Sequence, residues 1–504
     1  MMMIISSVIK VPGVLPMSEN NTPVIIGVSQ ILQRLDDPLA GKEVIDLMVD
    51  AVTQAAQDSG NSGLLKEVDS LRVIRGVWRY KQPAAYVAEK LGLGNVETVG
   101  TPYGGNYVQA VVNQSAREIL AGERSLIVLT GAENGNSQAK ARKSGITLPL
   151  TETMGSYSRF IGSEKPMSSE NEIARGIRAP IQFYPMFENA LRYKNKESIA
   201  DHQIRVSEMW AGFSEVASHN PNAWIRDKVD AETIRTASKR NRLISFPYPK
   251  MMNSNSAVDM ASALILCSVK KAKQLGVPES SWVYPLSGTD SQDTQFVSNR
   301  DNLHSSPAIR IAGNRALEMV NMNIADIDMI DVYSCFPSAV QVAINELNLD
   351  ITKPLTVTGG LTFGGGPLNN YVMHSIATMV DLLRKSPGKK GMITANGGML
   401  TKHAFGIYST EAPEIDFQYQ DCQDEVDLCP QRESVDTHEG EVNIETYTVM
   451  YDATGPKVAH AACLLPDGRR TWGNNFDLDL MNEMTKVEFC NKSVSLDRDG
   501  IFSA

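Results

Sequence analysis

Two short stretches of the chain carry the side chains best suited to chemistry. Tyr333 and Cys335 stand two residues apart, where a predicted strand passes into a predicted helix. A tyrosine hydroxyl serves as an acid or a base when its pKa is lowered, and a cysteine thiol offers a nucleophile. The alternative is a tyrosine that only packs in a pocket without activity.

His403 follows the turn formed by Asn396, Gly397 and Gly398. Such a turn can bring backbone N–H groups near a carbonyl oxygen, so we interpret His403 as an oxyanion donor or an acid. The alternative is a histidine that caps the turn. His374 falls one turn into a predicted helix, where a structural role is favoured.

Other reactive arrangements are missing from the sequence. The glycine run 364–366 lacks a following Lys-Ser or Lys-Thr pair, so it is not a phosphate loop and can simply allow close backbone packing. None of the six cysteines forms a C-x-x-C pair, and no metal-binding helix or dinucleotide fingerprint occurs. We therefore expect no metal site and no tightly bound cofactor.

The composition is that of an ordinary globular protein, with 42% hydrophobic and 21% charged residues among 504. The net charge of −10 argues against a nucleic-acid partner, which needs a basic face. No stretch approaches the roughly 20 apolar residues of a membrane span. Cys267 and Cys463 lie in apolar runs, and such buried thiols favour a reducing compartment, so we predict a cytoplasmic protein.

The first residues are set apart from the rest of the chain. Residues 1–16 are mildly apolar with one lysine, and they lack the basic region and cleavage site of a signal peptide. We predict that the fold begins after Met17 and that 1–21 is a disordered leader.

Strands and helices then alternate along the chain. TPVIIGVS (22–29) and DSLRVIRGVW (69–78) have the character of strands, whereas 43–58 and 83–93 have the periodicity of helices. This alternation predicts an α/β fold with a largely parallel sheet.

An internal repeat organises the middle of the chain. Asn106-Tyr107-Val108 recurs as Asn370-Tyr371-Val372, and each tripeptide opens an apolar-periodic helix that leads to a strand, SLIVLTG (125–131) or GMITANGG (391–398). The interval from Tyr107 to Thr130 equals that from Tyr371 to Thr394, and glycines precede both helices. We interpret this pattern as a duplicated α/β half.

Two further segments differ from the repeated halves. Residues 134–250 are rich in charge and helix formers and end in a basic stretch, which predicts a helical insertion that covers a substrate and neutralises phosphate, or else a solvated helical face. Residues 413–441 are acidic and polar, as in a linker. VNIETYTVM (442–450) and KVAHAACLL (457–465) alternate like strands, which predicts a small antiparallel β-barrel-like module at 442–504.

Several stretches resemble, in order, the sequence blocks of the thiolase superfamily. The resemblance covers about 22–410, and the β module is similar to the OB-like extra C-terminal domain of type-1 thiolase-like proteins. It implies a duplicated, five-layered fold with halves at 22–270 and 271–412. The blocks are SAREILAGERSLIVLTGAENG (115–135), NSNSAVDMASALILCS (253–268), DVYSCFPSAVQVAINELNL (331–349), GGLTFGGGPL (359–368) and TANGGMLTKHAFGIYST (394–410).

The resemblance also implies where a site would lie and shows that its chemistry has changed. Thiolases use a nucleophilic cysteine, a histidine that activates it, and a second cysteine that moves a proton. The nucleophile position falls near Gly105, Gly366 and Thr394 stand at the other two positions, and Tyr333 stands in place of the oxyanion-hole Asn or His. Cys335 corresponds to a cysteine that is not the acylated one. The residues expected to bind substrate are Gly105, Asn106, Gly366, Asn396, Gly397 and Gly398.

Three functions therefore stay open at this point. The first is an acyltransferase that acts on a coenzyme A thioester without the usual cysteines. The second is a lyase that cleaves β-hydroxyacyl-CoA by retro-aldol chemistry with Tyr333 as proton carrier, for which Tyr103, Tyr107 or Tyr371 would supply a second tyrosine. The third is an inactive acyl-CoA-binding or partner protein. The resemblance leaves both a homodimer and a monomer open.

Overall fold

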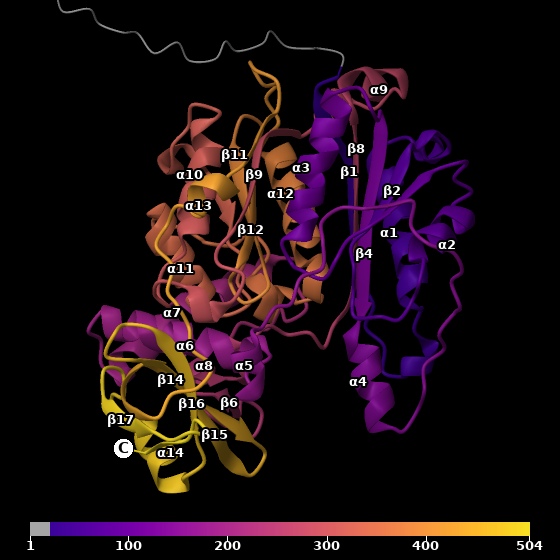
Figure 1. Ribbon diagram of the computed structural model, residues 1–504. Coiled ribbons are helices and arrows are strands. Elements are labelled where there is room, and N and C mark those ends of the chain that lie inside the picture. The colour runs from indigo at the N-terminus through magenta and orange to yellow at the C-terminus, as the bar shows by residue number, and fades with distance from the viewer. Residues whose placement is uncertain (1–20, 504) are drawn as a thin grey trace, which may run out of the picture.

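The computed structural model describes residues 21–503, so the predicted leader at 1–21 lies outside the described residues apart from Asn21. Sheets and helices alternate in five layers, and a smaller unit is attached below them (Figure 1). Within residues 21–503, no helix combines the length and the apolar character needed to cross a membrane.

The first sheet has the strand order β1-β8-β4-β2-β3-β5. β8 runs antiparallel to both β1 and β4, whereas β4, β2, β3 and β5 are parallel to one another. β1, β4, β2, β3 and β5 thus share one direction, which agrees with the prediction of a largely parallel sheet. β8 alone is reversed, because the chain returns from the insertion into β8, between β1 and β4. The strands are β1 Pro23–Leu32, β2 Ser70–Val73, β3 Glu97–Gly100, β4 Leu126–Asn134, β5 Arg159–Phe160 and β8 Asp259–Ser268.

The second sheet has the order β10-β11-β12-β9-β13. Its strands β9, β12, β11 and β10 repeat the order and the directions of β1, β8, β4 and β2. This match confirms the duplication predicted from the repeat. The strands are β9 Tyr284–Gln292, β10 Met329–Asp331, β11 Lys390–Gly397, β12 Lys402–Ser409 and β13 Gln418–Asp421.

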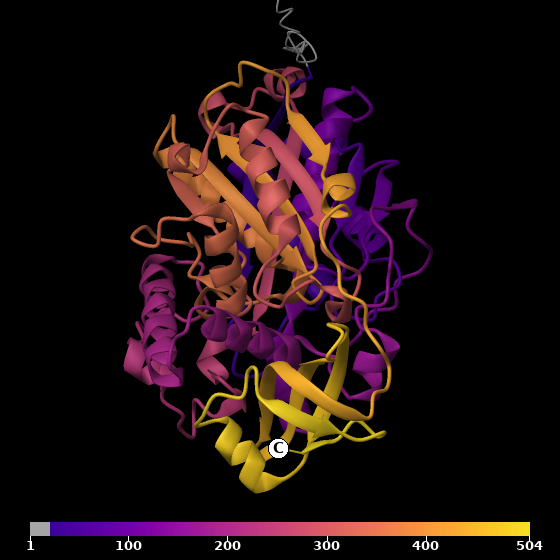
Figure 2. The ribbon, with the colours of Figure 1, turned by 60° about the vertical axis from the view of Figure 1, so that its left-hand side comes forward.

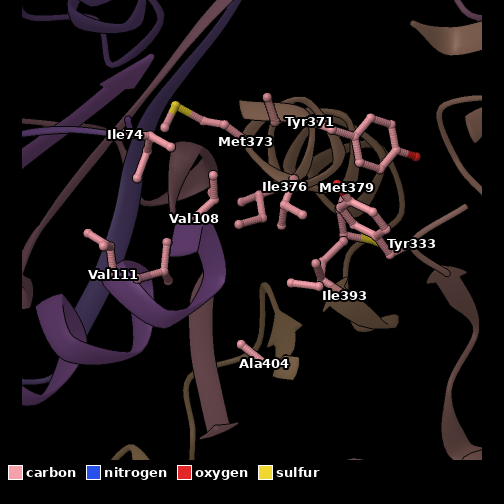
Figure 3. Packing of buried hydrophobic residues seen from close by; sticks show 14 of the residues in the cluster. Ile74, Val108, Val111, Tyr333, Tyr371, Met373, Ile376, Met379, Ile393 and Ala404 are labelled. Carbon is pink, nitrogen blue, oxygen red and sulfur yellow. The ribbon is translucent and has the colours of Figure 1, made fainter. Parts of the chain in front are cut away.

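The repeated tripeptides open the two helices that lie between the sheets. In α3 (Tyr107–Leu120) and α12 (Tyr371–Lys385), apolar side chains recur at helical spacing and are fully buried. Figure 3 shows Val108 of α3 and Ile376 of α12 facing the same core. The outer layers are α1 Val44–Asp58 and α2 Pro83–Lys90 on the first sheet, with α10 Pro307–Glu318 and α11 Pro337–Leu347 on the second.

The insertion at 134–250 is mainly helical, as predicted, and it also supplies strands. β5 joins the first sheet, and β6 (Leu243–Ser245) pairs with β7 (Tyr248–Pro249). The helices are α4 Gly135–Lys143, α5 Glu170–Ala174, α6 Pro180–Lys194, α7 Ile199–His219 and α8 Ala231–Arg235, and α9 Val269–Gln274 follows β8.

The segment 413–441 is more ordered than the linker that its composition predicts. β13 pairs parallel with β9 at the edge of the second sheet, and the short helix α13 (Gln423–Val426) follows. Phe417 and Cys422 are buried, which explains why this acidic segment is held against the core. The domain boundaries at 270, 412 and 441 stay predictions.

The C-terminal unit is an antiparallel sheet of order β16-β15-β14-β17-β18, to which β6 of the insertion adds a strand beside β14. The predicted barrel is corrected to an open sheet. β17 and β18 are short, and the two ends of the sheet are joined by a β-bridge between Asn474 and Ile501 and by a hydrogen bond from the Asn475 side chain to the Phe502 carbonyl, not by a continuous ladder. The elements are β14 Gly440–Asp452, β15 Gly455–Leu464, β16 Arg470–Asn475, α14 Leu478–Met484, β17 Ser493–Leu496 and β18 Phe502–Ser503.

One buried arginine joins this unit to the core. Arg470 is fully buried and forms a two-point ion pair with Glu445, each N···O distance being 2.7 Å. Its Nη1 also donates to the carbonyl oxygen of Ser298 at 2.9 Å, and Trp472 Nε1 donates to the Ser298 hydroxyl at 2.8 Å. Figure 2 shows the unit against the insertion helices at the base of the molecule.

We expect Arg470→Ala to lower the free energy of unfolding by about 3–5 kcal/mol, because it leaves the Glu445 carboxylate and several carbonyls without their partner. Urea unfolding and limited proteolysis measure this. Arg469→Ala is the matched control, because Arg469 pairs with Asp467 at the surface. A similar loss for both variants would contradict the docking role of Arg470.

Candidate active site around Tyr333

Tyr333 lies just beyond β10, on the segment that leads into α11. Its backbone N–H donates to Thr394 Oγ1 on β11 at 2.9 Å, so Thr394 fixes the backbone of Tyr333. The rings of Tyr333 and Tyr371 meet edge to face, with centroids 5.5 Å apart. Figure 3 shows both rings beside the apolar side chains of α12.

A buried carboxylate two residues before Tyr333 holds this region together. Asp331 is fully buried and accepts hydrogen bonds from Tyr371 at 2.8 Å and Ser375 at 2.7 Å, both on α12. Its other oxygen accepts from the Thr356 hydroxyl and the Val357 N–H, both at 2.9 Å. The Asp331 carboxylate therefore joins three parts of the chain. These are the end of β10, the start of α12 and the segment before the glycine-rich π-turn Gly360–Gly364.

The hydroxyl of Tyr333 points at Gly105. A Cβ atom built on Gly105 would lie 2.4 Å from the Tyr333 hydroxyl and 2.5 Å from the carbonyl oxygen of Asn396. Both distances are far below van der Waals contact. Position 105, near which the resemblance predicts the thiolase nucleophile, thus has no room for a side chain.

Tyr333 is neutral rather than activated as a base. Burial, followed by the neighbouring Cys335 and Tyr103, raises the pKa of Tyr333 well above its usual range. This is opposite to the lowered pKa that base chemistry requires. Within the described residues, the Tyr333 hydroxyl has no hydrogen-bond partner, so it is available as a donor.

The insertion contributes a tyrosine that the sequence analysis did not identify. Tyr184 of α6 accepts hydrogen bonds from Asn396 Nδ2 at 2.9 Å and from the Leu400 N–H at 3.0 Å. Its ring stacks on Phe336 at 4.5 Å between centroids. The Leu400 N–H, in the turn after β11, therefore donates to Tyr184. It is not available to donate a hydrogen bond to an oxyanion.

Cys335 shares this corner of the site. Its sulfur lies 3.8 Å from Asn396 Nδ2. Burial raises the pKa of the Cys335 thiol to about 12, and the adjacent Tyr184 and Asn396 offset this only in part. At neutral pH the group is a thiol rather than a thiolate, so it is a poor nucleophile.

Two buried amide oxygens at the site have no partner. Asn106 Oδ1 and Asn396 Oδ1 make no hydrogen bond, although both residues are buried. A Cβ on Gly397 would lie 2.3 Å from Asn106 Oδ1, so the two loops touch. Together with Tyr333 and Gly105, these residues form the group that the structure brings together, which we call the Tyr333 site.

His403 and Gly366 are directed elsewhere. His403 Nε2 lies 3.2 Å from the Leu400 carbonyl oxygen and 3.5 Å from Asp293, so this nitrogen faces groups inside the protein. Gly366 packs on the segment 254–255, where its N–H donates to the Asn255 carbonyl at 3.0 Å. The roles predicted for His403, Gly366 and Gly398 stay predictions; Gly398 has a positive φ of 64° in the hairpin turn between β11 and β12.

Two of the three tyrosines considered as partners of Tyr333 are otherwise engaged, whereas within the described residues Tyr103 makes no hydrogen bond and adds to the rise in the pKa of Tyr333. The Tyr371 hydroxyl is committed to Asp331, and Tyr107 lies against Gly162 and the Ser163 carbonyl. A cavity of about 10 Å³ behind the Tyr333 ring, toward α10 and α11, has room for one water at most.

Comparison with known proteins agrees with this architecture. Residues 421–501 match the family described as the thiolase-like protein type 1 additional C-terminal domain. The crystal structure of a monomeric SCP2-thiolase like protein type 1 from Mycobacterium smegmatis is similar, with 29% identity, a TM-score of 0.83, and 97% of this chain and 100% of that chain covered. The Ltp2–ChsH2(DUF35) aldolase shares the fold at 19% identity and a TM-score of 0.58, over 78% of this chain and 98% of that one.

A curated relative supports the same assignment. The acetyl-CoA acetyltransferase of Methanocaldococcus jannaschii is 22% identical over 306 residues, which are 60% of this chain and 70% of that protein. Fold and site together define a protein built on the duplicated thiolase architecture. These similarities support the thiolase superfamily as the family to which the chain is related.

We expect Gly105→Ala to lower the free energy of unfolding by about 1–3 kcal/mol, because the added methyl group overlaps the Tyr333 hydroxyl and a backbone oxygen. Thermal or urea unfolding measures this. Gly212→Ala is the control: this exposed helical glycine has open space around it, and the change should add up to about 1 kcal/mol of stability. An unchanged stability of Gly105→Ala would show that the two loops are not in contact.

His374 gives a prediction about acid stability. Burial lowers the pKa of His374 to about 3, whereas the unfolded imidazole titrates near 6.5. Between these values the unfolded state binds one more proton, so this residue makes the free energy of unfolding fall as the pH drops from 6.5 toward 3. We expect His374→Gln to reduce that slope by up to about 1.4 kcal/mol per pH unit.

Urea unfolding of this variant at pH 7.5, 5.5 and 4.5 measures the slope. The control is His219→Gln, because the His219 side chain is exposed and should leave the slope unchanged. Equal slopes for His374→Gln and the unmodified chain would contradict the buried, neutral imidazole.

Proposed function

We propose that this protein binds a coenzyme A thioester and acts on it without forming an acyl-enzyme, as a cysteine-free acyltransferase. One observation carries the proposal: the space for a nucleophile at position 105 is filled by the Tyr333 hydroxyl and a backbone oxygen. The relationship to the superfamily supports the thioester, and the acetyl-CoA acetyltransferase relative supports acyl transfer.

The residues of the site support a role in polarising a carbonyl group. A neutral phenol without a partner can donate a hydrogen bond to the thioester oxygen and stabilise the charge that develops there. Cys335 is unsuited to attack because its thiol stays protonated at neutral pH. In this proposal the acyl group therefore passes directly to a second bound molecule. The carbon–sulfur bond breaks as the new bond forms, and coenzyme A leaves as its thiol with the proton that the acceptor loses.

A retro-aldol lyase is the second candidate, favoured by the same free hydroxyl. In such a cleavage the bond between the α and β carbons breaks, its electron pair forms the thioester enolate, and the β-hydroxyl oxygen becomes a carbonyl. The proton that the hydroxyl loses is transferred by way of Tyr333 to the α carbon of the enolate. Tyr333 would stabilise and protonate that enolate. The likeness to an aldolase supports the fold and does not itself favour this reaction.

Location and assembly belong to the proposal as well. A cytoplasmic protein stays our prediction, and the described cysteines are all free. We favour a monomer, and the monomeric state of the similar mycobacterial protein supports this choice.

We expect acetyl-CoA or longer acyl-CoAs to bind in calorimetry without any added acyl mass in intact-protein mass spectrometry. Tyr333→Phe should weaken binding about 3–10-fold, because one hydrogen bond of roughly 0.5–1.5 kcal/mol is lost. The matched control is Tyr193→Phe, an exposed tyrosine on α6.

Different outcomes separate the candidates. An added acyl mass would contradict the cysteine-free mechanism, and peptide mapping would begin at Cys335. Release of a carbonyl product from β-hydroxyacyl-CoA that is lost in Tyr333→Phe would establish the lyase. Binding without turnover would leave a silent acyl-CoA-binding protein, and a complete lack of binding would reject the thioester.

A further inference from the structure

A second region of the molecule has the form of a binding site. A cavity of about 750 Å³ lies beyond the carboxyl ends of β2 and β4, where ligands bind in open α/β sheets. It is bounded by the segment after β2, by α4 and the residues that follow it, and by Leu368 from the second half. Its size is that of a pocket for a small organic molecule.

Glu133, at the end of β4, forms the floor of this cavity. Its side chain is almost fully buried, and Oε1 accepts a hydrogen bond from the Val77 N–H at 3.0 Å. No described residue donates to the other carboxyl oxygen. The charged or titratable groups that face the carboxyl are Arg75 and Tyr103, and neither forms an ion pair or hydrogen bond with it.

The environment keeps this carboxyl protonated near neutral pH. Burial raises the pKa of Glu133 to about 8, and the Val77 N–H and Arg75 offset the effect only in part. A protonated carboxyl donates a hydrogen bond, and it does not repel an electron-rich oxygen. The floor therefore suits a neutral carbonyl or amide oxygen rather than a carboxylate.

Part of the lining is aromatic and apolar, and Asn134, Gln138, Thr147 and Ser256 add polar groups. Trp78 Nε1 donates to the Ala132 carbonyl at 3.2 Å, and the Tyr80 hydroxyl donates to Glu43 at 2.8 Å. The polar ends of both rings are thus committed to the protein. Leu148 and Leu150 also line the cavity, and Leu150 is 55% exposed.

Two cations stand at the rim without partners. Arg79 and Arg142 line the cavity and are exposed, and within the described residues neither forms an ion pair or a side-chain hydrogen bond. Unpaired guanidinium groups at the mouth of an apolar cavity favour a ligand with an anionic end.

We propose that this cavity, which we call the Glu133 site, binds an elongated organic anion that has an apolar chain and a neutral carbonyl group. The carbonyl oxygen accepts a hydrogen bond from Glu133, the chain lies along Trp78 and Leu148, and the anionic end meets Arg79 and Arg142. The proposal goes beyond the function assigned to the Tyr333 site and does not depend on it.

The opposite orientation is disfavoured by electrostatics, although Arg75 faces the Glu133 carboxyl. A carboxylate placed on the floor would have to be desolvated beside the buried Glu133 carboxyl, and the exposed Arg79 and Arg142 would be left without an anionic partner. Burying an unpaired charge in this way is costly, whereas a neutral amide needs only the one hydrogen bond that the carboxyl offers.

The probe that tests this is N-octanoylglycine, which combines a carboxylate, an amide carbonyl and an apolar chain, with decanoate as a comparator that lacks the amide. Calorimetry on the full chain should show binding of N-octanoylglycine at pH 6.5 and about tenfold weaker binding at pH 9, one unit above the pKa of Glu133. Decanoate should bind more weakly at pH 6.5.

Two variants make the result specific. Glu133→Gln keeps a donor that does not titrate, so its affinity for N-octanoylglycine should be the same at pH 6.5 and pH 9. Arg142→Ala should weaken binding several-fold and reduce its salt dependence, whereas Lys143→Ala, next to it on α4 and outside the cavity, should not. Thermal melting confirms that each variant is folded.

Absence of N-octanoylglycine binding at pH 6.5 would overturn the proposal. So would a pH dependence that persists in Glu133→Gln, or equal effects of Arg142→Ala and Lys143→Ala. None of these results bears on acyl-CoA binding at the Tyr333 site, so the two proposals fail separately.

Discussion

The arrangement around Tyr333 depends on a single buried carboxylate. Asp331 ends β10 and receives hydrogen bonds from α12 and from the segment before the π-turn Gly360–Gly364, so three separate parts of the second half meet at its two oxygens. A buried acceptor of this kind is costly unless all its partners are present. The direction in which the chain leaves β10, and hence the place of Tyr333, follows from that requirement.

The Tyr333 phenol and the Cys335 thiol are uncharged, whereas thiolase chemistry requires a thiolate. Burial raises the pKa values of Tyr333 and Cys335 together, so the pocket holds a phenol and a thiol instead of a phenolate and a thiolate. Such groups polarise an oxygen but do not attack a carbon. Gly105 completes this change, because the absence of its side chain is what lets the phenol approach the loop so closely.

Local patterns explain why much of the fold was predictable. The apolar periodicity of α1, the repeated tripeptides before α3 and α12, and the hairpin of β14 and β15 each express a rule that acts over a few residues. The strand β13 was not predicted, because its residues are polar and lie at a sheet edge. The place of Tyr184 in the site was not predicted, because Tyr184 contacts Asn396 only through the tertiary fold. No residue near Tyr184 in the sequence indicates that contact. The direction of β8 depends on its pairing with β1 and β4, and the pKa of Tyr333 depends on its burial in the folded chain. Neither can be predicted from neighbouring residues in the sequence.

The two-residue strand β5 limits how the first sheet can pair with another chain. It occupies the outer edge of β3, where the Ser158 N–H donates to the Thr98 carbonyl and the Ile161 N–H to the Gly100 carbonyl. An unpaired strand edge can form hydrogen bonds with a strand of another chain, and here the edge of β3 is already paired with β5 of the same chain. A second copy could extend the first sheet at β3 only by displacing this segment of the insertion. Self-association through that edge is therefore limited by the insertion, and the C-terminal unit need play no part in it.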